Sequence, residues 1–190
     1  MTVAGIRDRL VKDSFFALVQ QGLDTLGWFD TGRAHRPVNL IDKPNHWDVP
    51  VTPNTVTVDF TGSDVEEWEV GSRLTSDLHI GYVEIYAEND SLGTHLANDM
   101  RDWLRGRLFP KPGVNFPIFD YRQGSTPPVI GHMDIDGVAA LRNVTVSEEV
   151  WMRHWFRVRC EIRDTYGGVS RSVPYPSPDL YPALALFPGE

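Results

Sequence analysis

The sequence predicts an α+β fold in which two helices pack against one mostly antiparallel β-sheet. Two segments, one at the N-terminus and one after residue 89, carry apolar residues at the three- and four-residue spacing of a helix. The segments between and after them alternate apolar and polar residues, as strands with one buried face do. The 190 residues are enough for one domain with a core and too few to expect two.

Proline placement indicates where this regular structure is expected. All 14 prolines fall outside residues 1–36, 54–109 and 129–173. Because proline disrupts helix interiors and central strands, these three blocks are expected to hold the helices and strands. The stretches 37–53 and 110–128 are expected to be long loops.

The first block is expected to form a helix from about Thr2 to Leu26. Thr2 can cap its N-terminus, and Gly27 is a plausible end. We expect the apolar face of this helix to pack on the core. The residues of that face are Val3, Ile6, Leu10, Phe15, Leu18 and Val19.

The second block is expected to hold strands at 55–60, 67–70 and 77–88, and then a helix. The strand 77–88 has apolar residues on both faces, which is typical of a central strand. Asp90-Ser91 can cap the helix that follows, and Gly106 can end it. Its apolar face consists of Leu92, Leu96, Met100, Trp103 and Leu104.

The third block is expected to contain only strands. Residues 129–136 and 138–146 are predicted to be joined by a tight turn at Asp136-Gly137. The last strand, 150–163, has one core face, with Met152, His154, Phe156, Val158, Cys160 and Ile162. Its other face carries Trp151, Arg153, Trp155, Arg157, Arg159, Glu161 and Arg163. Large aromatics beside arginines are typical of an interface, although long arginines also cover rings in ordinary surface packing.

Charge is unevenly distributed along the chain, whose net charge is −8. Residues 59–90 contain nine acids and a single base, Arg73, whereas residues 151–171 contain five arginines and two acids. The acidic balance argues against nucleic-acid binding as a bulk property. We expect either two solvated faces or, as the sharper hypothesis, acidic and basic surfaces that meet between copies of the chain.

Residues with catalytic or metal-binding chemistry are sparse. His132, Asp134 and Asp136 are the combination most suited to a divalent cation, although short acidic pairs near turns are common. His154 and Cys160 share a strand face but would lie about 20 Å apart. Common nucleotide-binding and hydrolase motifs are absent from the sequence. No catalytic, cofactor-binding or metal-binding residues are therefore predicted, and the chain is not expected to be an enzyme.

Other sequence features bear on the compartment. Cys160 is the only cysteine, so an internal disulfide is excluded. No run approaches 18 apolar residues, and the first residues carry charges where a signal peptide needs an apolar core. We expect synthesis in a reducing cytoplasm, without export or membrane insertion.

The order of these elements resembles the tail terminator proteins of long-tailed bacteriophages over roughly residues 1–166. An N-terminal helix precedes an extended strand, His79–Glu88, and an amphipathic helix closing on Arg105-Gly106 follows at once. After a variable loop, the final strand, Trp155–Ile162, alternates arginines and apolar residues and leads to Asp164. The chain departs from smaller members of this family in its loops at 30–54 and 107–128 and in its proline-rich end.

The resemblance implies a structural protein of the virion. Such a protein forms a ring, usually a hexamer, that caps the tail tube, contacts the major tail tube protein and presents a surface to the head-tail connector or stopper protein. Genomic DNA would pass through the lumen without sequence-specific contact. Alternatives within this class are a head-completion or adaptor protein of the neck and another minor tail protein.

Two hypotheses from other classes stay open at this point. One is a small-ligand-binding domain in which Trp28, Trp47 and Trp68 line a pocket. The other is a metal-dependent hydrolase that uses the His132, Asp134 and Asp136 group.

The chain is expected to consist of one domain, 1–173, and an extended C-terminal arm, 174–190. Prolines prevent the arm from forming a helix, and its apolar side chains would be costly to leave in water. We predict that it lies over a neighbouring subunit, so that deleting 174–190 weakens assembly and leaves the monomer folded. The candidate subunit-interface residues are Glu66, Glu67, Glu69, Trp151, Arg153, Trp155, Arg157, Arg159, Arg163, Tyr175, Tyr181 and Phe187.

Overall fold

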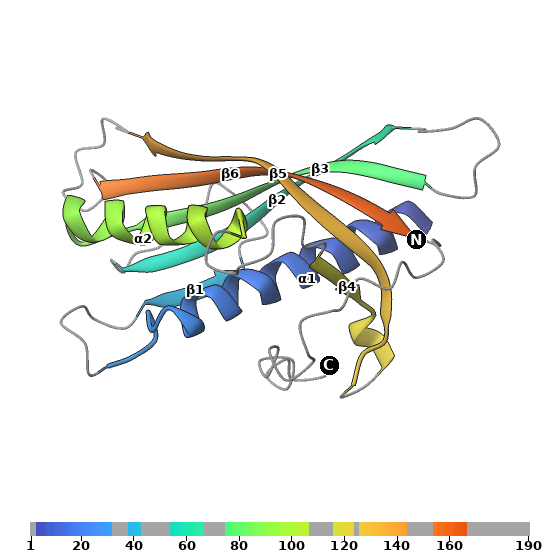
Figure 1. The fold of residues 1–190 in the computed structure, drawn as a ribbon, viewed down its shortest axis with the longest axis horizontal. Helices are drawn as coiled ribbons and strands as arrows, with labels where there is room; N and C mark the ends of the chain where they lie inside the picture. Colours follow the sequence, from blue (N-terminus) through green and yellow to red (C-terminus); the bar gives the residue numbers. More distant parts are fainter. Residues whose placement is uncertain are drawn as a thin grey trace.

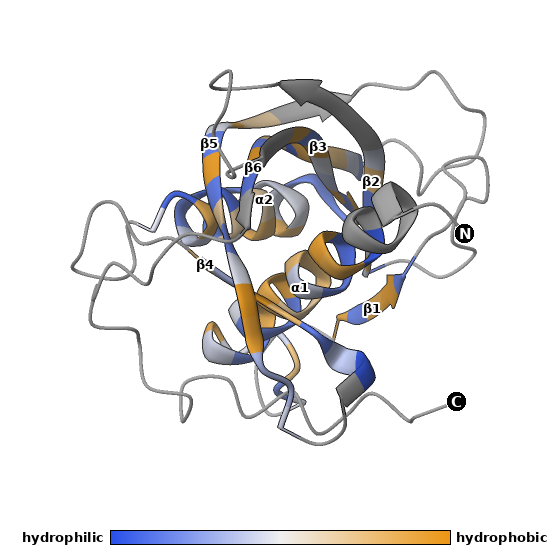
Figure 2. Ribbon diagram, turned by 90° about the vertical axis from the view of Figure 1, so that its right-hand side faces the viewer, coloured by the Kyte–Doolittle hydropathy of each residue, from blue (hydrophilic) through white to orange (hydrophobic). Residues whose placement is uncertain are grey.

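The computed structural model has the α+β architecture that the sequence predicts. It describes residues 3–31, 38–42, 54–66, 75–106, 116–123, 126–143 and 154–166. Within these ranges the chain forms two α-helices, a short 3-10 helix and one six-stranded sheet. Both α-helices lie on the same side of the sheet (Figure 1), and the sheet curves around them (Figure 2).

The sheet has the strand order β1-β2-β3-β6-β5-β4. Among the strands that the structure describes, only β1 and β2 pair in parallel, and the other four pairings are antiparallel. The predicted mostly antiparallel sheet, with residues 77–88 in a central strand, is therefore confirmed. The strands are β1 (Asn39–Asp42), β2 (Thr55–Glu66), β3 (Thr75–Tyr86), β4 (Phe116–Phe119), β5 (Val129–Asn143) and β6 (Trp155–Tyr166).

Helix α1 (Val3–Thr25) ends where the sequence predicts. Gly27 adopts a φ of +74°, which glycine tolerates without steric cost. This conformation turns the chain so that the Trp28 N–H donates to the Leu23 carbonyl at 2.8 Å. The turn satisfies a carbonyl at the helix end and directs Trp28 back toward the core.

Helix α2 (Asp90–Leu104) begins one residue after its cap, Asn89, whose side chain accepts a hydrogen bond from the Leu92 N–H at 2.9 Å. The cap therefore lies one position before the predicted Asp90-Ser91. Gly106, with a φ of +66°, follows the helix end as predicted.

The predicted turn at Asp136-Gly137 is wrong. Residues Val129–Asn143 form one strand, β5, that pairs with β6 both before and after this dipeptide. The register shifts between Asp136 and Ala139, and Gly137 has a φ of +57°. A glycine with positive φ suits a β-bulge as well as a hairpin turn, and a bulge bends the strand without ending it.

Two other expectations from proline placement also need correction. The stretches 37–53 and 110–128 were expected to be loops, but they contain the short strands β1 and β4. Both are edge strands, and Pro117 lies within β4, where an edge position tolerates its missing N–H. The strand predicted at 67–70 lies outside the described residues.

The core lies between the helices and the inner face of the sheet. Val83 and Ile85 of β3 and Val158 and Ile162 of β6 are fully buried there. The helices add their predicted apolar faces, including Phe15 and Leu18 from α1 and Leu96, Met100 and Trp103 from α2. The face opposite the helices is called the outer face below.

Gly93 of α2 permits a close approach to the sheet. A Cβ atom at this position would lie 2.1 Å from the Phe156 ring. We expect Gly93→Ala to lower the free energy of unfolding by about 2 kcal/mol, because overpacking outweighs the roughly 1 kcal/mol by which alanine favours a helix. Urea denaturation would measure the change. Thr94→Ala, at the exposed next position, is the control, and equal effects of the two substitutions would contradict this account.

Candidate functional site

The centre of the outer face carries a cluster of aromatic and charged side chains from β3 and β6. The two strands place Tyr82 opposite Arg159, Glu84 opposite Arg157 and Tyr86 opposite Trp155. Because side chains alternate across a strand and Val83 and Val158 are buried beneath the helices, these six side chains belong to the outer face. We call them the outer-face cluster.

Glu84 is the anchor of this cluster. Its side chain is only 1% exposed although it carries a carboxylate. Arg157 donates to Oε1 from Nε at 3.0 Å and from a terminal nitrogen at 2.5 Å, and the Tyr86 hydroxyl donates to Oε2 at 2.9 Å. Burial, together with the adjacent Glu84 carboxylate, raises the pKa of Tyr86, so the phenol stays a hydrogen-bond donor. These contacts compensate for the removal of the carboxylate from water.

Aromatic rings hold Arg157 on its other sides. Its guanidinium carbon lies 4.8 Å from the centre of the Tyr82 ring and 5.0 Å from that of Trp155. The Trp155 and Tyr86 rings are stacked, with centroids 6.0 Å apart and an interplanar angle of 6°. Such cation–π and stacking contacts fix the side chains in one arrangement before any partner arrives. Trp155 and Arg157 nevertheless stay partly exposed.

A second arginine lies at the rim of the cluster. Arg159 forms an ion pair with Glu161 at 3.0 Å, and both side chains are about one-third exposed, at 35% and 37%. Solvent-exposed pairs of this kind contribute little to stability. Because both side chains are partly exposed, their charges can also interact with the charges of another surface.

The structure places part of the predicted interface in this cluster. Trp155, Arg157, Arg159 and Arg163 lie on the outer strand face that the sequence assigned to them. Glu66 ends β2, but its side chain is not among those described. The arm 174–190 lies outside the described residues, and so do the other members of the predicted interface. Those members are Glu67, Glu69, Trp151, Arg153, Tyr175, Tyr181 and Phe187.

The structure also shows where part of the segregated charge is neutralised. The acidic segment contributes β3 and the basic segment contributes β6, and the two strands are neighbours in one sheet. Glu84 pairs with Arg157 inside one chain. Sequence reasoning missed Tyr82, Glu84 and Tyr86 as site residues. Their alternation along 77–88 indicated a shared face, but their partners on β6 depend on the strand order.

The metal-site hypothesis finds no support in the described residues. These residues contain no group of three or more histidine, cysteine or acidic side chains arranged to hold a metal ion. Burial raises the pKa of Asp134 and lowers that of His132, so each environment disfavours the charged form. Elsewhere, the buried His79 and Asp164 approach to 3.4 Å on the inner face.

The ligand-pocket hypothesis is not supported by Trp28. This side chain is 2% exposed in the core, and its indole N–H donates to Asp99 of α2 at 3.1 Å. Trp28 therefore joins the end of α1 to α2. The other two tryptophans of that hypothesis, Trp47 and Trp68, lie outside the described residues.

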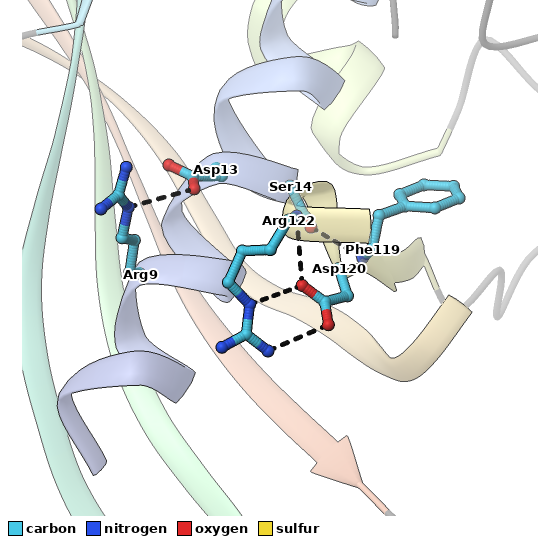
Figure 3. A network of polar contacts seen from close by, with 6 residues as sticks. All are labelled: Arg9, Asp13, Ser14, Phe119, Asp120 and Arg122. Atoms are coloured by element: carbon cyan, nitrogen blue, oxygen red, sulfur yellow. Dashed lines mark hydrogen bonds and ion pairs between the residues drawn. The ribbon is translucent and has the colours of Figure 1, made fainter. Parts of the chain in front are cut away.

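A network of polar contacts fixes the edge strand β4 beside α1 (Figure 3). The Phe119 N–H donates to the Ser14 hydroxyl at 3.0 Å. Arg122 donates to both carboxylate oxygens of Asp120, at 2.7 and 2.9 Å. The small pocket between α1 and β4 has a volume of about 10 Å³, which is room for a single water. The contacts therefore serve packing, and this pocket is too small for an organic ligand.

Cys160 is buried on the inner face of β6, and its thiol lies 3.6 Å from the Gly81 carbonyl. Burial raises its pKa to about 12. Since the thiolate is the reactive form, we expect the native protein to resist a thiol reagent at pH 8 and to react when unfolded in urea. Rapid labelling of the native protein, at a rate independent of urea, would contradict this burial.

The same group makes stability depend on alkaline pH. Above pH 9, the ordinary pKa of the thiol, the unfolded chain loses this proton while the native chain keeps it up to about pH 12. Cys160 should therefore lower the free energy of unfolding by about 1.4 kcal/mol per pH unit in this window. Urea denaturation of the wild type and Cys160→Ala measures this as a difference in slope, and parallel slopes would contradict it.

Comparison of the chain with protein-family models and with curated protein sequences finds no match. Neither described helix has the length and hydrophobicity needed to cross a membrane.

Proposed function

We propose that this chain is a structural subunit of the ring that terminates the tail tube of a long-tailed bacteriophage. The element order of the described residues supports the proposal. Helix α1 opens the fold, β3 runs into α2 within a few residues, and the arginine-rich β6 lies beside β3. This is the order on which the resemblance to tail terminator proteins rests.

The outer-face cluster is the observation that carries the proposal. Aromatic residues and arginine are enriched at the centres of protein interfaces, where rigid side chains bind at little entropic cost. In this chain the buried Glu84 carboxylate and the Tyr82 and Trp155 rings hold Arg157 in place. Glu84 and Tyr86 are buried beneath this arrangement, and Tyr82, Trp155, Arg157 and Arg159 remain partly exposed. An ordered, partly exposed set of this kind suits a protein that acts by contact.

In such a ring each subunit contacts other copies of itself, the major tail tube protein on one side and the head-tail connector or stopper protein on the other. DNA crosses the lumen without sequence-specific contact, in keeping with a net charge of −8. The protein is made in the host cytoplasm and resides in the virion. The outer-face cluster is assigned to contacts within this assembly.

The first test is the native mass of the purified protein, with negative-stain imaging of the same sample. Rings of about six copies are expected, the number that the resemblance implies, and one repeated contact would close them. A template-dependent subunit would instead be monomeric, so purified tail tubes are added and their ends imaged. A protein that forms no ring and does not cap tubes is not a terminator. Binding to the head connector alone would favour the neck-adaptor alternative.

A matched pair of substitutions tests the outer-face cluster itself. Trp155→Ala removes a partly exposed ring that contacts both Tyr86 and Arg157. We expect it to weaken ring formation or tube capping at least tenfold, since central aromatic residues often contribute more than 1.4 kcal/mol to an interface. Arg9→Ala is the control, because Arg9 is an exposed residue of α1, in the helical layer on the other side of the sheet. Equal assembly by both folded variants would exclude the cluster from the interface.

A further inference from the structure

One edge of the sheet has a long stretch of backbone to which the described residues supply no neighbouring strand. Strand β1 pairs only with Thr55–Val58 of β2. From Asp59 to Glu66, β2 pairs with β3 on one side, with a shift of register between Thr61 and Asp64, and no described strand lies on its other side. An unpaired strand edge presents N–H and C=O groups that can pair with another chain.

A second open stretch lies at the opposite edge. Strand β4 pairs with β5 only between Val129 and Met133. From Asp134 to Asn143, β5 pairs with β6 on one side, and the described residues place no strand on its other side. The two open stretches have similar lengths, eight residues on β2 and ten on β5.

The two open edges are matched in direction. Three antiparallel pairings lead across the sheet from β2 through β3 and β6 to β5, so β2 and β5 run antiparallel to each other. A copy placed with its β5 beside this β2 continues the antiparallel alternation. Strand β1 covers the start of β2 and β4 covers the start of β5, so the open stretches, called the β2 window (59–66) and the β5 window (134–143), are the later residues of each strand. Antiparallel pairing of the two windows places Asn143 of one copy near Asp59 of the other, and Asp134 near Glu66.

One backbone N–H at the open edge of β2 is bound by a side chain of its own strand rather than by a neighbouring strand. The Asn39 N–H of β1 donates to the Asn54 carbonyl at 2.9 Å, so even-numbered residues at the start of β2 direct their backbone groups toward β1. By the same alternation Phe60 directs its N–H to the open edge. That N–H is bound by the neighbouring Asp59 carboxylate at 2.8 Å. A carbonyl from a pairing strand would replace this local acceptor.

Charge favours a contact between different edges over a two-fold contact of β2 with itself. The β2 window contains Asp59, Asp64 and Glu66. A two-fold antiparallel pairing would bring Asp59 of one copy opposite Glu66 of the other at both ends of the contact, which is unfavourable. The β5 window contains Asp134 and Asp136 at the end nearest Glu66 and Arg142 at the end nearest Asp59. Its net charge is therefore −1, against −3 for the β2 window, so pairing different edges brings less like charge together.

We propose that residues 59–66 of one copy pair with residues 134–143 of the next, so that the sheet continues from subunit to subunit. Two different surfaces of one chain then meet, and such a heterologous contact closes into a ring when the rotation allows. This inference rests on the proposed ring and names its repeated contact. It also leaves the outer-face cluster, at the centre of the sheet, for the tail tube or connector.

Cysteine pairs in the full-length chain test the contact. Thr61→Cys on β2 is combined in turn with Ala139→Cys, Ala140→Cys or Leu141→Cys on β5. Cys160 is buried and does not interfere. Ala139 shares the outer face with Thr61, and residue 141 is the register partner of Arg157, whereas Ala140 is the register partner of the inward-facing Val158. Mild oxidation should yield a ladder of covalent oligomers with 139 or 141, and none with 140 or with any single substitution.

Several outcomes would overturn the contact. Disulfide dimers of Thr61→Cys alone would indicate a two-fold β2 contact. Rings that give no ladder with any pair would reject this contact while the proposed function stands. A ladder from a protein that never caps tail tubes would keep the contact and reject the terminator function. As a measurement free of substitutions, hydrogen exchange at 59–66 and 134–143 should slow at least tenfold on assembly, and unchanged exchange in the ring would also overturn the proposal.

Discussion

Replacing Arg157 by methionine is expected to lower the free energy of unfolding by about 3 kcal/mol, although Arg157 lies on the face of the sheet without helices. The substitution removes the guanidinium that neutralises the Glu84 carboxylate, which is only 1% exposed. The cost of a buried carboxylate without its cation is larger than the loss of one surface ion pair. The Arg157 side chain is 29% exposed, so water can enter the space that the guanidinium leaves. This water moderates the loss of stability.

A double-mutant cycle distinguishes this electrostatic cost from lost packing. Glu84→Gln in the Arg157→Met background removes the buried charge and keeps a side chain of the same shape. The double variant should recover at least about 1 kcal/mol relative to Arg157→Met, as measured by urea denaturation. If the two substitutions are simply additive, the buried ion pair does not organise the cluster, and the outer face loses its main structural anchor.

The elements that the sequence predicted well are those set by local patterns. The periodicity of 2–26 and 92–104 marked α1 and α2, because a helix repeats its buried face every three to four residues. The alternation of Trp155 to Ile162 correctly divided β6 into a core face and an arginine face. Gly27 and Gly106 were also predictable from local sequence, because a glycine with positive φ commonly follows the end of a helix.

The features that sequence reasoning missed depend on contacts between distant parts of the chain. Strand β1 has four residues, too few for a recognisable pattern, and it exists because β2 offers an edge. Gly137 suited either a turn or a bulge, and pairing of β5 with β6 on both sides of it decides for the bulge. The Glu84–Arg157 pair joins residues 73 positions apart. Its two charges were visible in the sequence, but their adjacency follows from placing β3 beside β6.

Removing the indole of Trp103 should have the other large effect, a loss of about 4 kcal/mol in the free energy of unfolding. Trp103 is 1% exposed and is among the largest fully buried side chains of the core. Its indole N–H donates to the Leu18 carbonyl of α1 at 3.1 Å. Trp103→Ala leaves a cavity between the two helices, whereas Trp103→Phe keeps most of the volume and should cost about 2 kcal/mol. Similar losses for both variants would show that the site collapses around alanine.

Gly22 makes this a test of the contact between α1 and α2. A Cβ atom at Gly22 would lie 2.7 Å from Cδ1 and Nε1 of Trp103. Gly22→Ala should therefore destabilise the wild type by about 2 kcal/mol. In the Trp103→Ala background it should be neutral or stabilising, since the clash is gone and alanine favours a helix by roughly 1 kcal/mol. This reversal of sign, measured in one denaturation series, would show that the glycine is needed for the tryptophan. If Gly22→Ala instead lowers the free energy of unfolding equally in both backgrounds, the glycine is required by the backbone of α1 and not by Trp103.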